Sequence, residues 1–352
     1  MFFLIFTFEL SEIVFHKIIK EVLAVKIVLI GSTGHTNYVV NGLKDNYEDQ
    51  IVGIAPGSEG ENVDSLYQKL AKDYEIEKYN DYKEMLDDLK PDVAAVACHF
   101  GDHADAAVEV LNRNIDLFVE KPIATTLAKL DDVKSAYEKS ESKLVSMFGI
   151  RYKPWFLTVY KYIKEGAIGE VRLMNAQKSY RLGQRAEFYK KRETYGGTIP
   201  WVGSHAIDWM QWLSGKDFKS VYASHSTKAN QNHGELEVSA LCHFNFEDEI
   251  FGSVNIDYLR PQNATSHDDD RIRIAGDKGV IEVLKEKVYL INDQIEGSRE
   301  LPLVANKEIF ADFLDWVKGQ GECLISAEES FRVTEAALQA RESADKKQLI
   351  QF

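Results

Sequence analysis

The stretch that decides the fold is Val25–Leu43, which reads VKIVLIGSTGHTNYVVNGL. Its first six residues form an almost continuous apolar run rich in β-branched side chains, typical of a strand buried on both faces of a parallel sheet. The turn GSTGHT follows over residues 31–36, where such a strand leads into a helix. Glycine permits the tight turn there, and the helix N-terminus offers N–H groups to a pyrophosphate. The full GxGxxG pattern is absent, because Thr33 and Thr36 occupy its second and third glycine positions.

The pattern of that stretch repeats along the first half of the chain. Predicted strands alternate with predicted helices up to about residue 148, which indicates βαβ units and a doubly wound parallel sheet. The strands are expected at 25–30, 51–54, 93–97 and 117–119, and the helices at 63–74, 82–89, 104–112 and 127–140. We therefore predict an NAD(P)-binding Rossmann domain over residues 25–148.

Beyond residue 148 the predicted strands are longer and alternate between apolar and polar residues. They are expected at 171–178, 220–226, 236–246, 250–258 and 271–275, with helices at 155–165, 205–213, 306–318 and 327–346. Alternation of this kind is typical of strands with one solvated face. We therefore predict an α/β fold in which a second domain, residues 149–352, has an open, mainly antiparallel sheet covered by helices on one side.

Composition limits the functions open to this chain. The 352 residues carry a formal net charge of −14, and the isoelectric point is near 5.2. Such a charge repels phosphate backbones and anionic lipid, so we expect neither nucleic acid nor a membrane as a partner. Cys98, Cys242 and Cys323 are widely spaced and form neither a disulfide framework nor a CxxC metal motif. This usage predicts a cytoplasmic protein with reduced thiols.

Residues 1–24 differ from the rest of the chain. MFFLIFTF, at 1–8, is shorter than the roughly 20 apolar residues that span a bilayer, and it lacks the basic start and cleavage site of a signal peptide. Residues 9–24 resemble a short amphipathic helix. Two interpretations stay open: a docking extension, or an upstream stretch wrongly included in the reading frame, with Val25 as the true start. We favour the second.

The second predicted strand bears on the choice of cofactor. Its end, IVGIA over residues 51–55, runs into Pro56-Gly57-Ser58, with Glu59 and Glu61 only later. The acidic residue that usually bonds the adenosine ribose is therefore missing from its place, and no Arg or Lys follows to hold a 2′-phosphate. Either NAD or NADP fits, and NAD is slightly favoured.

Two further segments carry a resemblance to a known family. The first reads DVAAVACHFGDH over residues 92–103 and continues to Glu120-Lys121-Pro122 at the end of the fourth predicted strand. The second reads YGGTIPWVGSHAIDWMQWLSG over residues 195–215. Together with RIRIAGDKGVIEV over residues 271–283, they resemble the glucose–fructose oxidoreductase, inositol dehydrogenase and rhizopine-catabolism (Gfo/Idh/MocA) family across residues 25–352.

The resemblance implies an NAD(P)-dependent dehydrogenase acting on a secondary alcohol of a sugar, sugar acid or cyclitol, with homo-oligomers formed through the C-terminal sheet. Hydride transfer from an alcohol needs a base for the hydroxyl proton and a cation to polarise the oxygen. His205 is the expected base and Lys121 the expected electrostatic partner. The cofactor is expected at Gly31, Ser32, Thr33, Gly34, His35, Cys98, His99, Phe100, His103, Glu120 and Lys121.

Several positions depart from the family pattern. Members often carry an Asp four residues before the histidine, where this chain has Trp201, a residue expected either on a sugar ring or in the core. Asp208, one helical turn on, is expected to orient His205 or to serve as a structural hydrogen-bonder. Arg151 and Lys153, in the family's Arg-x-x-Pro segment, are expected near substrate. The usual Thr-Pro-Asn after the third strand is replaced by residues 98–100, Cys-His-Phe, which are expected to face the nicotinamide.

A basic segment precedes the predicted base. Residues 178–195 carry six Lys and Arg against two Glu, a net charge of +4. This segment is either a solvated loop or a positive funnel for an acidic substrate. No metal is expected, because His243, His267 and Asp268–Asp270 lack zinc-ligand spacing. Two other functions stay open: a nucleotide-sensing regulator that has lost catalysis, and a reductase of non-sugar carbonyls.

Overall fold

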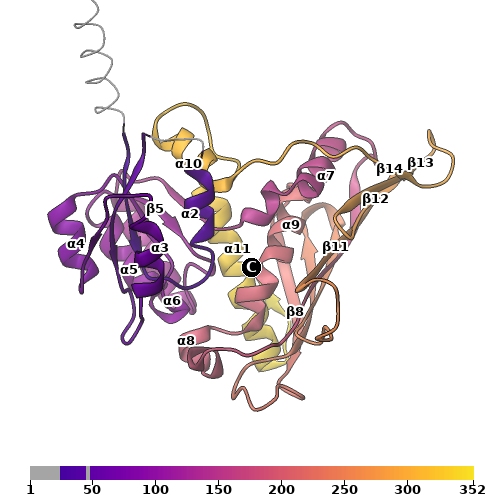
Figure 1. Cartoon of the computed structure of the whole chain (residues 1–352). Helices are drawn as coiled ribbons and strands as arrows, with labels where there is room; N and C mark the ends of the chain where they lie inside the picture. The colour runs from indigo at the N-terminus through magenta and orange to yellow at the C-terminus, as the bar shows by residue number, and fades with distance from the viewer. Residues whose placement is uncertain (1–23, 45–47) are drawn as a thin grey trace, which may run out of the picture.

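Two β-sheets, with helices packed on and between them, make up the chain in the computed structural model, which describes residues 24–44 and 48–352 (Figure 1). The predictions made for residues 1–23 lie outside the described residues. The first sheet has six parallel strands in the order β3-β2-β1-β4-β5-β6. This is the doubly wound sheet predicted from the sequence, and its strand order reverses between β1 and β4.

The first sheet is built from short strands whose residues are mostly buried on both faces. Its strands are β1 (Lys26–Ile30), β2 (Gln50–Ala55), β3 (Glu77–Lys78), β4 (Val93–Val96), β5 (Asp116–Val119) and β6 (Leu144–Ser146). Its helices are α2 (Asn37–Gly42), α3 (Asp64–Leu70), α4 (Tyr82–Leu89), α5 (His103–Leu111) and α6 (Leu127–Lys139). All four residues of β4 are buried, as expected for a central parallel strand covered by helices on both sides.

The second sheet has nine strands in the order β14-β13-β12-β11-β7-β10-β9-β8-β15. Only β7 and β10 pair in parallel among these described strands; every other neighbouring pair is antiparallel, which confirms the predicted open, mainly antiparallel sheet. The strands are β7 (Val171–Tyr180), β8 (Phe218–Ser226), β9 (Ser239–Phe246), β10 (Phe251–Asp257), β11 (Asp268–Gly276), β12 (Gly279–Leu284), β13 (Lys287–Asn292), β14 (Arg299–Glu300) and β15 (Ile350–Gln351).

Helices cover one face of the second sheet. Those in contact with its strands are α7 (Pro154–Lys164), α9 (Ser204–Ser214) and α11 (Ala327–Lys346). Two further helices of this half of the described chain, α8 (Arg192–Tyr195) and α10 (Ile309–Val317), pack elsewhere. Short turns of helix are η1 (Phe100–Asp102), η2 (Gly149–Tyr152), η3 (Glu187–Lys190), the π-helical η4 (Ile199–Gly203) and η5 (Glu247–Glu249). Helix α11 lies between the two sheets and contacts β8 on one side and α6 and β6 on the other (Figure 1).

The late part of the chain also packs on the first sheet. Helix α10 lies against α2, and a Cβ on Gly42 would stand 2.7 Å from the backbone nitrogen of Ala311. The small residue thus allows the two helices to approach closely. Among the described residues, no helix is both long enough and apolar enough to cross a bilayer.

The face of the second sheet that the helices leave uncovered is partly apolar. Its exposed side chains include Leu173, Tyr222, Leu241 and Phe251, which are 41–53% exposed. Leu173 and Phe251 are register partners on β7 and β10. Alternation along β9, where every second residue is buried, places Leu241 on the solvent side, as the sequence pattern predicts.

Candidate active site between the two sheets

Lys121 lies directly after β5, at the carboxyl edge of the first sheet. Its side chain is 1% exposed, and its Nζ donates to the Trp201 carbonyl oxygen at 2.8 Å. The same nitrogen stands 4.4 Å from the centre of the Trp201 indole. Burial lowers the pKa of Lys121 to about 7, opposed by the Glu120 carboxylate at 3.9 Å and reinforced by the charge of Lys178. The ammonium group therefore titrates near neutrality.

His205, the second residue of α9, is fully buried beside Lys121. Neither of its ring nitrogens has a hydrogen-bond partner among the described residues. Burial, followed by the charges of Lys121, Lys178 and His35, lowers the pKa of His205 well below its ordinary value of 6.5. The imidazole is therefore neutral at pH 7, and its ring stands 5.8 Å from that of His35. Buried polar atoms are rarely left unbonded in folded proteins, so these nitrogens indicate a place for a ligand.

Glu120 joins the phosphate turn to the lysine. Its fully buried carboxylate accepts from the backbone N–H of His35 at 3.1 Å and lies 2.9 Å from the His35 Nδ1. Burial alone would raise the pKa of Glu120, but His35 and then Lys121 outweigh it, so the net shift is downward. The carboxylate is ionised at neutral pH and holds its two cationic or hydrogen-bonding neighbours in place.

The turn over residues 31–36 has the close backbone approach that glycine permits. Gly31 has a φ of +93°, and a Cβ there would stand 2.5 Å from the Ala97 carbonyl oxygen. Gly34 has a φ of +76°, and a Cβ there would press on the Glu120 side chain at 3.0 Å. The turn therefore sits against the carboxyl ends of β1 and β4, where the strand order reverses and where doubly wound sheets bind ligands.

Glu61, in the loop after β2, accepts hydrogen bonds from this turn. Its Oε1 accepts from the Ser32 backbone N–H at 2.9 Å and from the Thr33 hydroxyl at 3.0 Å, and its Oε2 accepts from the Gly57 N–H at 3.0 Å. Sequence reasoning found no acid at the end of the second strand, because this carboxylate comes six residues after β2 ends and returns through the loop. A glutamate near the strand end was the only signal available.

Residues 98–100, after β4, are held by packing. Cys98 is fully buried, and burial raises the pKa of its thiol. The backbone N–H of His99 donates to Ser58 Oγ at 3.0 Å, and the ring stacks on Phe188 at 4.6 Å. Phe100 is fully buried and stacks on the Trp201 indole at 5.3 Å. The Phe100 ring thus supports the indole that covers Lys121.

Both ring nitrogens of His103 face backbone carbonyl oxygens, and the neutral ring donates its one N–H to one of them. Its Nδ1 lies 2.8 Å from the Pro122 carbonyl oxygen, and its Nε2 lies 3.1 Å from that of Cys98. Burial lowers its pKa. These contacts join the ends of β4 and β5, and the role of His103 in cofactor binding stays a prediction.

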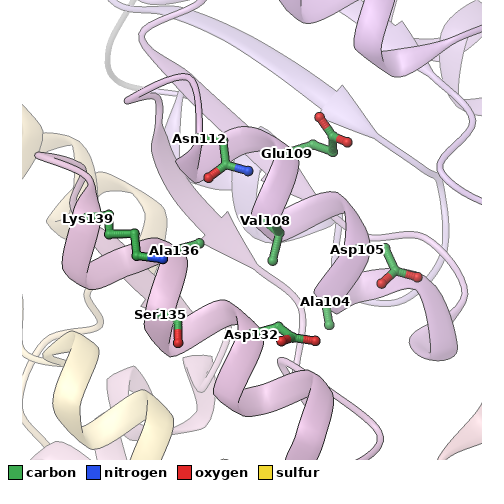
Figure 2. Close-up of a pocket in the computed structure, with 9 residues that line it drawn as sticks. All are labelled: Ala104, Asp105, Val108, Glu109, Asn112, Asp132, Ser135, Ala136 and Lys139. Carbon is green, nitrogen blue, oxygen red and sulfur yellow. The ribbon is translucent and has the colours of Figure 1, made fainter.

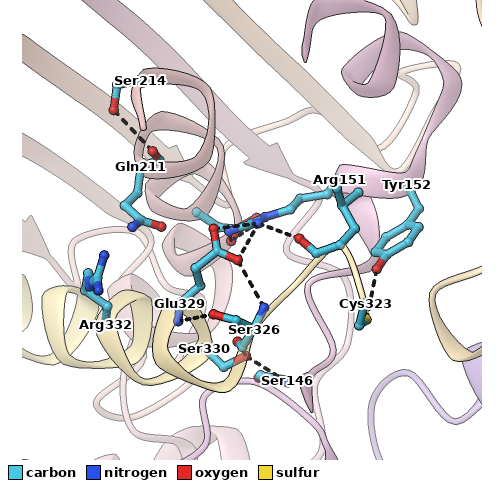
Figure 3. A network of polar contacts seen from close by, with 12 residues as sticks. Ser146, Arg151, Tyr152, Gln211, Ser214, Cys323, Ser326, Glu329, Ser330 and Arg332 are labelled. Carbon is cyan, nitrogen blue, oxygen red and sulfur yellow. Dashed lines mark hydrogen bonds and ion pairs between the residues drawn. The ribbon is translucent and has the colours of Figure 1, made fainter. Parts of the chain in front are cut away.

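The predicted substrate residues Arg151 and Asp208 form a buried ion pair. Figure 3 shows Arg151 bonded also to Glu329 of α11. The fully buried Arg151 guanidinium donates through Nε and Nη2 to Asp208 at 2.7–2.9 Å and through Nη1 to Glu329 at 3.2 Å. Asp208 forms no hydrogen bond with His205, because both of its carboxylate oxygens accept from the arginine. The contacts of Asp208 therefore match its alternative role as a structural hydrogen-bonder and not the orientation of His205. Lys153 is exposed at the start of α7.

Trp201 lies in the core, which is one of its two expected places. It is 8% exposed within η4, its carbonyl oxygen holds Lys121, and its Nε1 has no partner among the described residues. The indole is part of the core, yet its unbonded N–H lies in the same buried region as His205. Sequence reasoning missed two further charged residues of this region, Lys178 and Asp270, which form an ion pair on the second sheet.

The basic segment is largely neutralised by its surroundings. Outside the segment, Asp270 pairs with Lys178, and Glu237 and Asp345 pair with Arg192. Lys190 pairs with Glu187 of the segment itself. Arg181 and Arg185 donate to backbone carbonyl groups, and the Arg185 guanidinium lies 4.9 Å from the Tyr258 ring. The net charge of +4 therefore overstates the positive potential that this segment presents.

A cavity of about 430 Å³ lies away from these residues, between α5 and α6 (Figure 2). None of its lining side chains belongs to the predicted site or has an unbonded buried polar atom. A second cavity, of about 390 Å³, is lined by Asp270, Trp155 and Arg260 among others. Within the two described ranges, 24–44 and 48–352, no group of three or more His, Cys, Asp or Glu is placed to hold a metal ion.

Known proteins resemble this chain in sequence and structure. Residues 25–148 match an oxidoreductase family model with an NAD-binding Rossmann fold, and residues 156–282 match the model of the GFO/IDH/MocA C-terminal domain. A solved putative oxidoreductase from Thermotoga maritima is 51% identical, with a TM-score of 0.90 over 93% of this chain and 100% of that chain.

More distant relatives include characterised dehydrogenases. Inositol 2-dehydrogenase from Salmonella typhimurium is 32% identical over 148 residues, which are 42% of this chain and 42% of that protein. The match thus spans less than half the length of this curated relative. Levoglucosan dehydrogenase, solved in complex with NADH, is 18% identical with a TM-score of 0.80 over 93% of this chain and 99% of that chain, a likeness of fold.

Proposed function

Because the chain belongs to the Gfo/Idh/MocA family of NAD(P)-binding oxidoreductases, we propose that it transfers hydride between a nicotinamide and a secondary alcohol of a sugar or cyclitol. The observation that carries this proposal is the buried pair of Lys121 and unbonded His205 at the edge where the first sheet reverses its strand order. The lowered pKa of Lys121 reflects the free-energy cost of burying its charge. A sensor that only binds nucleotide does not need a buried lysine at this place.

The electrostatics of the pair favour a definite division of roles. Lys121, with a pKa of about 7, exists partly as the free amine at neutral pH and is suited to accept the hydroxyl proton during oxidation. His205 stays neutral and is suited to donate a hydrogen bond from its ring N–H to the substrate oxygen. This reverses the roles expected from the sequence, in which histidine was the base. Bound nicotinamide supplies the hydride acceptor.

We propose NAD as the preferred cofactor. The glycine turn over residues 31–36 and the buried Glu120 fit a dinucleotide, because only glycine at position 31 brings the turn so close to β4. Glu61 places a carboxylate between this turn and the loop after β2, where the adenosine ribose of a dinucleotide is bonded in such folds. A carboxylate there accepts from ribose hydroxyls and repels a 2′-phosphate.

A neutral polyol is our proposed substrate, and an acidic sugar is the second candidate. Three of the six cations in residues 178–195 are paired with carboxylates, which leaves Arg181, Arg185 and the exposed Lys191 as the support for an acid. The relatives named above as inositol 2-dehydrogenase and levoglucosan dehydrogenase act on uncharged polyhydroxy compounds, as their names state.

Homo-oligomers through the second sheet complete the proposal. The face left uncovered by helices carries the apolar side chains Leu173, Tyr222, Leu241 and Phe251. Leu173 and Phe251 are register partners, and exposed apolar surface of this kind supports an interaction site. A Leu241→Glu variant is expected to have a lower mass in light scattering than the native chain.

Two measurements test the proposed function. Fluorescence titration with NADH and NADPH gives the dissociation constants, and a panel of myo-inositol, glucose, galactose, glucuronate and gluconate with NAD gives turnover. Tight NADH binding with oxidation of a neutral member supports the proposal. NADH binding without turnover of any member would favour the sensor, and faster turnover of the acids than of the neutral sugars would favour the second candidate.

A further inference from the structure

A buried ion pair stands on the inner face of the second sheet. Lys178 on β7 and Asp270 on β11 are direct register partners, and the lysine Nζ donates to the two carboxylate oxygens at 2.6 and 2.7 Å. The Lys178 side chain is fully buried, and that of Asp270 is 12% exposed. The lysine retains one N–H and the carboxylate retains lone pairs beyond those used between them.

The position of this pair is not explained by the needs of the sheet. The preceding inward-facing register pairs of the same two strands are Met174 with Ile274 and Ala176 with Ile272, and all four are buried. A buried ion pair gains little stability over apolar residues of similar size, because desolvation offsets the Coulomb attraction. Apolar residues in place of Lys178 and Asp270 would have continued the core, so packing of the core does not explain why these two positions are charged.

The pair stands next to the proposed active site. Lys178 Nζ lies 4.7 Å from the Tyr180 ring centre and 5.7 Å from that of Trp209, on the helix that carries His205. The Tyr180 ring lies 6.4 Å from the Trp201 indole, which in turn covers Lys121. The charge of Lys178 also lowers the pKa of both Lys121 and His205, as expected for a cation in the same buried region.

A cavity is lined in part by the carboxylate of this pair. It has a volume of about 390 Å³, and Asp270 lines it together with Trp155, Arg260 and Glu286. The cavity is of the size that holds a small molecule. Asp270 thus borders both an open space and the buried region that contains Lys121 and His205.

We infer that Lys178 and Asp270 form a polyol-binding subsite, in which one substrate hydroxyl donates to the Asp270 carboxylate and a neighbouring hydroxyl accepts from the Lys178 ammonium. This inference rests on the proposed function and adds the part of the substrate away from the reacting carbon. An acceptor and a donor held side by side match two adjacent hydroxyls, each of which can donate and accept. A carboxylate substrate would meet Asp270 as a like charge, so the subsite selects neutral polyols.

The test is the double variant Lys178→Met/Asp270→Leu, compared with Arg273→Gln/Glu282→Gln. The first removes both charges and leaves no unpaired ion, so the fold is expected to survive. The control removes another cross-strand ion pair of β11, on the exposed face, where the two side chains are 45% and 38% exposed. Steady-state kinetics use NAD with whichever of myo-inositol, glucose and galactose the native enzyme oxidises best, and with glycerol.

We expect the Lys178→Met/Asp270→Leu variant to raise KM for the larger polyol about 10- to 100-fold with a smaller change in kcat, because interactions away from the reacting carbon contribute uniform binding. KM for glycerol, which is too small to reach the subsite from the reacting position, is expected to stay within about twofold, and NADH affinity is expected to match the native value. The control variant should match the native enzyme throughout.

Other outcomes separate the two proposals. Unchanged KM for the larger polyol, or an equal rise for glycerol, would overturn the subsite while leaving the proposed function intact. A native enzyme that binds NADH but oxidises no polyol would overturn both. If the double variant fails to fold, Lys178→Leu/Asp270→Val, which also removes the donor and the acceptor, replaces it, and a KM for the larger polyol equal to the native value then rejects the subsite.

Discussion

Two fully buried charged clusters of this molecule differ in how completely their polar atoms are bonded. Around Arg151, every guanidinium nitrogen has a partner in Asp208, Glu329 or the Leu324 carbonyl. Around Lys121, the ammonium has one carbonyl acceptor and His205 has no partner at all among the described residues. In the cluster around Arg151, hydrogen bonds within the protein offset the free-energy cost of removing the charges from water. In the cluster around Lys121 few such bonds offset that cost, so its polar atoms are available to a ligand.

Removing the lysine should produce the largest effect on activity. In Lys121→Met we expect kcat to fall about 10³-fold or more, because both the proton acceptor and the nearby charge are lost. NADH affinity should change by less than fivefold, since Glu120 remains bonded to His35. Turnover with NAD and the best polyol, together with NADH titration, measures both. A loss of nucleotide binding that parallels the loss of turnover would contradict this assignment.

The same substitution should stabilise the protein, and the pH dependence has a definite sign. The Lys121 pKa is about 7 in the folded state against an ordinary value of 10.5, so the unfolded chain binds more protons between these values. Stability contributed by this site therefore rises from pH 7 toward 10.5. Lys121→Met removes the penalty, and its Tm should exceed the native Tm most clearly at pH 7 and below. An equal or lower Tm there would contradict the lowered pKa.

Arg151→Met should destabilise the protein, in contrast to Lys121→Met, and it tests the cluster around Arg151, in which every guanidinium nitrogen is hydrogen-bonded. The substitution strands the buried Asp208 carboxylate, so we expect a loss of about 3 kcal/mol in the free energy of unfolding. Chemical denaturation at pH 7 measures the loss. Arg151→Met/Asp208→Leu should recover most of it, because neither ion is then left unpaired. If the single variant is as stable as the native protein but inactive, Arg151 belongs to the site after all.

The pH profile distinguishes the two groups of the active site. The kcat/KM for alcohol oxidation should fall about tenfold per pH unit below a pKa of about 7 and level off above it, because Lys121 must be the free amine to accept a proton. His205→Asn should lower the plateau about 10²-fold and keep the inflection. If the inflection disappears in His205→Asn instead, histidine is the base, as the sequence alone had led us to expect.

The class of both sheets could be predicted from the sequence, because the spacing of apolar residues along a strand shows which of its faces are buried. The prediction failed at specific turns. The β12–β13 hairpin was not predicted, since its turn is made by Lys285 and Glu286, which have φ values of 52° and 62°. Such turns are normally recognised by Asn or Gly. The family motifs led to Lys121 and His205. Lys178, the last residue of the predicted strand 171–178, was considered only as part of the basic segment, although it continues the inward positions of Met174 and Ala176.

Glu61 illustrates why some site residues cannot be found from spacing alone. A carboxylate is expected where the second strand ends, and here it returns from six residues beyond Ala55 because the Gly57 N–H and the Ser32 N–H anchor it. When a loop folds back and brings a side chain to the end of a strand, the number of residues between that strand and the side chain is not fixed. The structure is needed to show that Glu61, and not the exposed Glu59, closes the phosphate turn.

The smallest predicted effect concerns the choice between cofactors. In Glu61→Gln we expect the ratio of NADPH to NADH dissociation constants to fall about tenfold, because the amide no longer repels a 2′-phosphate while it can still hydrogen-bond. Glu59→Gln removes an equal charge two residues away on an exposed side chain and should leave the ratio within about twofold. Fluorescence titration with both nucleotides measures it. An equal shift in the two variants would mean that general charge, and not the carboxylate on the turn, sets the preference.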